Sequence, residues 1–228
     1  MSDPLLQIDK KIKISKKEIL KDYYLINESR QLSLLGRKEV FMGRAKFGVF
    51  GDGKELPQIA MSKVFENGDI RSGYYRDQTF MMAIDQLTSN QFFSQLYSHT
   101  DVKKDPHSAG RQMNCHFATR MLNDSGEWKT LTDIKNSTSD ISCVAGQMPR
   151  LIGLAYASKL YRNNSSLSNE QNFSINGNEV AFGTIGDAGT SEGHFWEAVN
   201  AIGVLQVPSI ISIWDDDYGI SVSNEIQM

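Results

Sequence analysis

Two short polar clusters in the last quarter of the sequence carry residues suited to holding a metal-bound anion. The first is residues 186–189 (GDAG), and the second is residues 215–219 (DDDYG). The glycines let the backbone approach a ligand closely. The carboxylates suit Mg²⁺, which prefers a few protein oxygens together with phosphate oxygens and water. The two clusters therefore predict a site for magnesium and a diphosphate group.

The residues around these clusters predict the elements that bring them together. Residues 179–185 (EVAFGTI) and 207–214 (VPSIISIW) have the pattern of buried strands, and residues 192–205 that of the helix between them. The helix has its apolar positions at i, i+3, i+4 and i+7, which are Phe195, Ala198, Val199 and Ile202. Such a unit is typical of a parallel sheet. Because ligands bind beyond the carboxyl ends of parallel strands, we expect Asp187 and Asp216 to lie together.

Simpler explanations of both clusters stay open at this point. One simpler explanation is that Ser191 acts as a helix N-cap and has no ligand-binding role, with the charge of Glu192 favouring the first helical turn. The three aspartates at 215–217 can form a solvated turn. In the ligand interpretation, the helix that opens near Ser191 instead points free amide groups at an anion.

The rest of the chain predicts helices joined by polar loops. The expected helices cover residues 16–37, 56–65, 80–96 and 148–161. The expected non-regular segments are an arm at 1–15 and loops at 43–53, 71–79, 101–140 and 167–177. We therefore expect an α/β protein with a parallel sheet flanked by helices. Its expected parts are an N-terminal arm and helix (1–36) and one domain (37–228), and the fold is expected to be incomplete at the C-terminus.

Composition excludes several classes of protein. Of the 228 residues, 40% are hydrophobic and 22% charged, and the net charge is −3, so a general nucleic-acid or anionic-membrane binder is disfavoured. No signal peptide or run of about 18 apolar residues is visible. Cys115 and Cys143 are too few for a disulfide framework. We interpret them as two buried, reduced thiols of a cytoplasmic protein that does not contact membranes.

Four ordered motifs give the sequence a family resemblance. They are YYRDQ at 74–78, GRQM at 110–113 followed by His116, AGQMP at 145–149, and the long segment 186–221 that contains both polar clusters. Together they resemble the α-type subunit of the thiamine-diphosphate-dependent decarboxylating component of 2-oxoacid dehydrogenases, of the pyruvate or branched-chain type. The resemblance runs from about residue 36 to 226 and implies a thiamine-diphosphate-binding fold.

The resemblance assigns a ligand set to the predicted site. It implies that Mg²⁺ is held by Asp187, Asp216 and the backbone carbonyl of Tyr218. It implies that Tyr75 and Arg76 contact the diphosphate, for which an Arg fork is well suited. The cofactor-binding backbone would include Gly186 and Ala188. The alternative for Arg76 is that it forms a surface ion pair.

Three further residues come from the same resemblance. Backbone groups around Ser142 and Val144 would meet the aminopyrimidine ring, and Val144 would support the folded shape of the cofactor. His116 resembles a family histidine that faces the active site and is the one catalytic candidate. The alternatives are a core valine at Val144 and a loop histidine at His116.

The resemblance also implies partners. In this family the cofactor decarboxylates a 2-oxoacid, and the acyl group passes to a lipoyl-bearing acyltransferase. A glutamate on a β-type subunit or domain activates the cofactor, and no residue here matches that motif. We therefore expect the chain to be inactive alone, to be the N-terminal part of an α–β fusion or to pair with a separate β-type chain, and to form an oligomer. The helix at 148–161 is the candidate for packing against that partner or another copy.

The sequence departs from the family pattern at three positions. Ala188 replaces the third motif glycine, Asp216 replaces the closing asparagine, and Trp214 stands where relatives place a polar or charged residue. Two other segments imitate known motifs: residues 51–53 (GDG) lack a second polar cluster downstream, and residues 48–54 (GVFGDGK) lack the Ser or Thr of a phosphate loop. A transketolase-like enzyme, a non-catalytic assembly subunit and a nucleotide-binding α/β protein are the competing interpretations.

Overall fold

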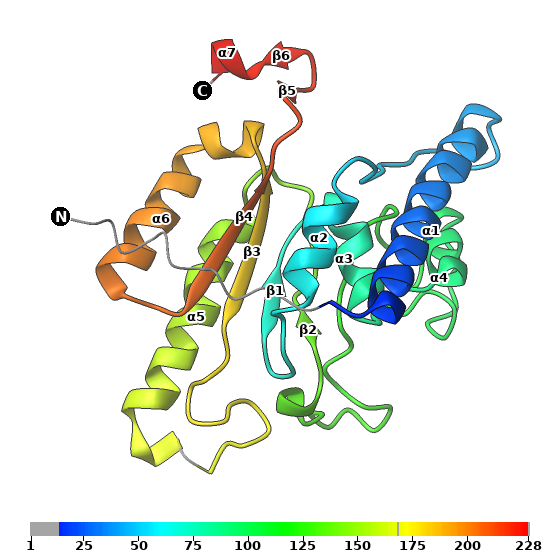
Figure 1. The fold of residues 1–228 in the computed structure, drawn as a ribbon. Helices are drawn as coiled ribbons and strands as arrows, with labels where there is room; N and C mark the ends of the chain where they lie inside the picture. Colours follow the sequence, from blue (N-terminus) through cyan, green and yellow to red (C-terminus); the bar gives the residue numbers. More distant parts are fainter. Residues whose placement is uncertain (1–13, 168, 228) are drawn as a thin grey trace.

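A parallel four-stranded sheet forms the centre of the chain in a computed structural model (Figure 1). The structure describes residues 14–167 and 169–227, so almost all of the arm expected at 1–15 lies outside the described residues. The strand order is β2-β1-β3-β4. These strands span Ile70–Ser72 (β1), Asn136–Ser137 (β2), Ala181–Gly186 (β3) and Ser209–Trp214 (β4).

The predicted strand–helix–strand unit is confirmed. The helix α6 (Gly193–Leu205) connects β3 to β4, and the two strands pair in parallel from Ala181↔Ser209 to Gly186↔Trp214. Both strands therefore end at the same edge of the sheet. The α/β class with a parallel sheet flanked by helices is likewise confirmed.

Helices cover both faces of this sheet (Figure 1). Alternation along β3 sends Phe182 into a core with Phe65 and Phe80, on the side of α2 (Glu55–Ser62) and α3 (Gln78–Ala83). On the same strand, Ala181 and Ile185 face the other way, into a core with residues of α5 (Gln147–Asn163) and α6. The fully buried pattern of β3 is what a central parallel strand requires.

The remaining helices are α1 (Lys16–Phe41), α2 (Glu55–Ser62), α3 (Gln78–Ala83), α4 (Ser89–Leu96), α5 (Gln147–Asn163) and the short α7 (Asn224–Gln227). Helices α1, α2 and α5 lie close to the expected ranges. The single helix expected at 80–96 is wrong, because a left-handed residue, Asp85 (φ 61°), separates α3 from α4, and α7 is not among the expected helices. The start of α1 is fixed by Ser15, whose hydroxyl accepts from the Glu18 amide. Thr88 and Gln91 form a capping box at the start of α4. Within the described part of the chain, no helix is both long and apolar enough to span a membrane.

One expected loop contains a strand. The polar segment RSGYYRDQT begins with the last two residues of β1, Arg71 and Ser72, and both are fully buried. Sequence pattern disfavours a strand here because arginine is rarely buried without a partner. In the structure Arg71 has two partners, Asp77 and Asp140, at 2.6 and 3.0 Å. The expected loop at 101–140 also holds the short strand β2.

Three smaller expectations are wrong. The N-cap position of α6 is Glu192, not Ser191, because a 3₁₀ turn at Ala188–Ser191 precedes the helix. On α6, Phe195 and Ala198 are buried, whereas Val199 is exposed. Both cysteines are free, but Cys143 is exposed while Cys115 is buried.

Candidate cofactor site

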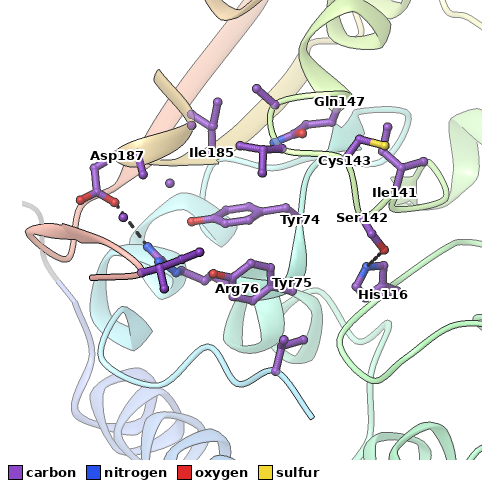
Figure 2. Close-up of a pocket in the computed structure, with 18 of the residues that line it drawn as sticks. Tyr74, Tyr75, Arg76, His116, Ile141, Ser142, Cys143, Gln147, Ile185 and Asp187 are labelled. Carbon is purple, nitrogen blue, oxygen red and sulfur yellow. Dashed lines mark hydrogen bonds and ion pairs between the residues drawn. The ribbon is translucent and has the colours of Figure 1, made fainter. Parts of the chain in front are cut away.

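The polar segments that follow three neighbouring strands meet at one edge of the sheet. A 3₁₀ turn at Tyr75–Asp77 follows β1, the turn at Ala188–Ser191 follows β3, and residues 215–217 follow β4. A pocket of about 290 Å³ opens between the first two of these turns, residues 218–220 and the loop at 141–145 (Figure 2). The predicted site residues that line it are Tyr75, Arg76, His116, Ser142, Val144, Gly186, Asp187, Ala188 and Tyr218. Asp216 reaches the same place through Arg76.

Asp187 is the buried carboxylate of this site. Its side chain follows directly after β3 and the residue is 1% exposed. One oxygen, Oδ2, accepts from Nδ2 of Asn224 at 2.7 Å. The other, Oδ1, is buried and has no hydrogen-bond partner. A buried carboxylate oxygen without a hydrogen bond is costly unless a cation or another ligand meets it.

Arg76 lies between the two strand-end carboxylates. Its Nη1 is 2.8 Å from Oδ1 of Asp216 and 3.6 Å from Oδ1 of Asp187. The same nitrogen donates to the backbone carbonyl of Trp214 at 2.9 Å. The guanidinium also lies over the rings of Tyr74 and Tyr75, 5.9 and 5.6 Å from their centroids. Arg76 is therefore neither a loose surface cation nor a simple ion pair; it joins the ends of β1, β3 and β4.

The two carboxylates differ in their tendency to take up a proton. Burial alone would raise the pKa of Asp187, but hydrogen bonds from Asn224 and Asp216 hold that pKa below its ordinary value. The pKa of Asp216 is raised, by burial and by the neighbouring Asp187, despite the attraction of Arg76. Asp216 is thus the first of the pair to protonate as the pH falls.

The departure at Ala188 has a steric counterpart on the adjacent segment. A Cβ built on Gly219 would lie 2.6 Å from the Ala188 methyl group, closer than carbon atoms can pack. The missing side chain at Gly219 therefore makes room for the alanine in the GDA sequence. Gly186 also lies close to other groups: a Cβ there would be 3.3 Å from Arg76 Nη1 and from the Tyr74 hydroxyl.

His116 and Ser142 form a pair on the opposite wall of the pocket (Figure 2). Nε2 of His116 lies 2.9 Å from the Ser142 hydroxyl, and Nδ1 lies 3.2 Å from the backbone carbonyl of Asn114. Because a carbonyl can only accept, Nδ1 carries the proton of the neutral ring and Nε2 accepts from Ser142. His116 lies in a loop, and its side chain is buried at the wall of the pocket.

The wall next to this pair is apolar and accessible. Ile141, Cys143 and Val144 line the pocket, and the Val144 side chain is exposed, which excludes a core valine. The Val144 carbonyl accepts from Nε2 of His194 at 2.9 Å. This contact ties the loop to the first turn of α6.

A buried network of charged and polar side chains around Asp77 lies next to the site, and the sequence pattern does not reveal it. Asp77 accepts from Arg71 on β1, from the Thr184 hydroxyl on β3 and, at 2.7 Å, from the Trp214 indole on β4. Asp77 belongs to the YYRDQ motif, which is the one signal that could have identified it. Trp214 thus contacts two consecutive residues, Arg76 through its carbonyl and Asp77 through its side chain.

The described residues fit a magnesium-bound diphosphate. Asp187 Oδ1 and the Tyr74 hydroxyl are both buried without a hydrogen-bond partner beside Arg76. No group of three or more His, Cys, Asp or Glu residues arranged for a metal ion occurs in residues 14–167 and 169–227. A complete protein cage is therefore not formed by these residues. Mg²⁺ suits such a site, because it commonly takes one or two carboxylates and completes its shell with phosphate oxygens and water.

The GDG sequence at 51–53 does not belong to this site. Asp52 forms an ion pair with Arg37 at 2.7 Å, and the Gly53 amide donates to the Glu55 carboxylate. The segment joins α1 to α2, so a helix and not a strand directly precedes it. Its two acidic neighbours, Asp52 and Glu55, are therefore engaged with groups of the protein.

A family model described as the dehydrogenase E1 component matches residues 30–228. The chain belongs to this family. Relatives include α subunits of 2-oxoisovalerate dehydrogenase, from mitochondria of Caenorhabditis elegans and Homo sapiens and from Bacillus subtilis. The C. elegans protein is 26% identical over 81% of this chain and 36% of its own length. The corresponding values are 24%, 82% and 47% for B. subtilis, and 25%, 94% and 41% for the human protein. This E1 chain thus spans less than half the length of these relatives.

Proposed function

We propose that this chain binds thiamine diphosphate through Mg²⁺ and forms the cofactor-anchoring part of a 2-oxoacid dehydrogenase. The observation that carries the proposal is the meeting of Asp187, Asp216 and Arg76 at the ends of β1, β3 and β4. A cation beside the two carboxylates would bring phosphate oxygens next to the guanidinium. Membership of the E1 family supports thiamine diphosphate as the diphosphate.

The roles of the site residues follow from their chemistry. Asp187, Asp216 and the backbone carbonyl of Tyr218 would hold Mg²⁺. Arg76, with Tyr75 beside it, would hold the diphosphate oxygens. The backbone at Gly186 and Ala188 would approach the same group, because Gly186 has no side chain to block it.

Residues on the opposite wall would meet the other end of the cofactor and the substrate. Backbone groups at Ser142 and Val144 would contact the aminopyrimidine, and the exposed Val144 side chain would support the bent cofactor. His116 would face the 2-oxoacid. Its Nε2, which accepts from Ser142, is positioned to exchange a proton within the pocket.

The complete reaction needs more than this chain. Thiamine diphosphate, when bound, supplies the carbon nucleophile and electron sink that decarboxylation of a 2-oxoacid requires. We assign the glutamate that activates it to a β-type subunit or domain, and acceptance of the acyl group to a lipoyl-bearing acyltransferase. This chain would orient the cofactor and exclude water from its diphosphate end.

Reconstitution tests the proposal. The chain would be assayed alone and with a β-type subunit of a 2-oxoisovalerate dehydrogenase, with Mg²⁺, thiamine diphosphate and an artificial electron acceptor. We expect CO₂ release from a 2-oxoacid only in the mixture. Decarboxylation by the chain alone would contradict the division of roles. Cofactor binding without turnover in the mixture would favour a non-catalytic assembly subunit.

A further inference from the structure

The segment after β4 folds back over the turn that carries Asp187. Tyr218–Gly219 (β5) pairs antiparallel with Val222–Ser223 (β6), and α7 follows directly. Gln227 Nε2 donates to the Ala188 carbonyl at 3.3 Å, and the Ser191 hydroxyl donates to the Gln227 carbonyl at 3.1 Å. The segment at 218–227 therefore contacts both the first and the last residue of the turn at Ala188–Ser191.

Asn224 occupies the point where this segment meets the carboxylates. Its Nδ2 donates to Asp187 Oδ2 at 2.7 Å and to Asp215 Oδ1 at 3.1 Å. Its backbone amide donates to the Asp217 carbonyl at 3.0 Å, which fixes its position on the segment. One side-chain amide thus links the carboxylates that follow two neighbouring strands.

The contact has a direct consequence for Asp187. Asn224 satisfies Oδ2, whereas Oδ1 on the same carboxylate is buried without a hydrogen bond. The side chain is therefore held with Oδ2 engaged by Asn224 and with Oδ1 facing the Arg76 guanidinium, 3.6 Å from Nη1. Partners of this kind orient metal-ligating carboxylates in known metal sites.

We propose that Asn224 is a positioning residue for the cation site: its amide orients the Asp187 carboxylate so that Oδ1 is presented to Mg²⁺. This inference rests on the proposed function. The amide must act as a donor, because turning it over would place its own oxygen against two carboxylate oxygens. The amide is also uncharged. It therefore adds no further negative charge beside Asp187, where Asp216 already replaces the family asparagine.

Calorimetric titration of Mg²⁺ into the chain paired with a β-type subunit, in the presence of thiamine diphosphate, tests this role without any activity assay. Asn224→Ala removes the donor, and Asn224→Asp replaces it with an isosteric group that cannot donate when ionised. We expect each variant to bind Mg²⁺ about 10- to 100-fold more weakly than the wild type. Asn224→Asp separates two explanations. If only the negative charge near the site mattered, the added carboxylate would tighten Mg²⁺ binding, whereas loss of the donor that orients Asp187 weakens it.

Gln227→Ala is the matched control. It removes the contact of the same segment with the Ala188 carbonyl but leaves the Asn224 amide in place. Its Mg²⁺ affinity should stay within threefold of the wild type. Wild-type affinity in Asn224→Ala, or equal or tighter binding in Asn224→Asp, would overturn the positioning role while the proposed function stands. A wild-type chain that binds neither Mg²⁺ nor thiamine diphosphate when paired with the β-type subunit would instead overturn the proposed function.

Discussion

Arg76 and Asp216 form an ion pair, with Nη1 and Oδ1 2.8 Å apart, across the ends of β1 and β4. The guanidinium proposed to hold the diphosphate is thus engaged by a carboxylate proposed to hold the cation. A divalent cation next to Asp216 and Asp187 would weaken their attraction for Arg76 and leave it free for phosphate oxygens. Cation and diphosphate are therefore expected to bind cooperatively, each favouring the other.

Removing the buried carboxylate should abolish ligand-dependent stabilisation. Asp187→Ala deletes the carboxylate oxygen that is buried without a hydrogen bond, 3.6 Å from Arg76 Nη1. We expect the variant to show no rise in melting temperature with Mg²⁺ and thiamine diphosphate. The control is Asp52→Ala, which removes the aspartate of the other GDG sequence and its ion pair with Arg37. If Asp52→Ala lost the response while Asp187→Ala kept it, the assignment of the cofactor site to Asp187 would be wrong.

Restoring the family asparagine at position 216 should keep or tighten cofactor binding. Asp216→Asn removes one negative charge near the diphosphate and releases Arg76 from its ion pair. The amide oxygen remains available to Mg²⁺. Titration of thiamine diphosphate into both proteins at fixed Mg²⁺ measures the difference. Binding more than tenfold weaker in the variant would mean that the aspartate charge itself is needed.

The same variant should change how stability depends on pH in the absence of ligands. The pKa of Asp216 is raised above its ordinary value of 3.8, so ionising this group costs the folded state free energy. At low pH, where the carboxyl is protonated in both states, that cost is absent. It begins to develop near pH 3.8, where the unfolded chain ionises, and it is complete once the pH exceeds the raised pKa of the folded state. Asp216→Asn should therefore gain unfolding free energy relative to the wild type over this window. Urea unfolding at a series of pH values measures it, and a gain that shrinks with rising pH would contradict the assignment.

Trp214→Phe should destabilise the fold through the loss of a single hydrogen bond. The variant keeps an aromatic ring but removes the indole N–H that donates to buried Asp77 at 2.7 Å. Leaving a buried carboxylate oxygen unpaired costs about 1–3 kcal/mol of unfolding free energy, which urea unfolding measures. Trp196→Phe, at an exposed position on α6, is the control and should stay within about 0.5 kcal/mol. Equal effects in both variants would show that the network around Asp77 is not strengthened by Trp214.

The sequence predicts the part of the fold whose signals are local. The strands β3 and β4 are apolar runs, and α6 between them has helical periodicity, so the parallel unit can be read directly. The meeting of Asp187 and Asp216 then follows from the geometry of parallel strands. The strand β1 is missed for a physical reason. Its Arg71 is buried only because Asp77 and Asp140 neutralise it, and Asp140 lies far along the chain.

The missed site residues share this dependence on distant contacts. Asn224 meets Asp187 only because β5 and β6 pair and return the chain to the turn. Nothing in the residues around Asn224 indicates that contact. The exposure of Cys143 similarly depends on the pocket that opens beside the loop at 141–145, not on the identity of its neighbours.

Cooperative binding of Mg²⁺ and thiamine diphosphate is the most direct test of the account. With the β-type part present, melting temperatures of the chain would be measured with Mg²⁺ alone, thiamine diphosphate alone, and both together. A ligand that binds only the folded state adds about 2.7 kcal/mol of stability at 100 times its dissociation constant. We predict that both together raise the melting temperature by more than the sum of the separate effects, and that EDTA reverses the gain. Equal stabilisation by thiamine diphosphate with and without Mg²⁺ would contradict a cation bridge between Asp187, Asp216 and the diphosphate.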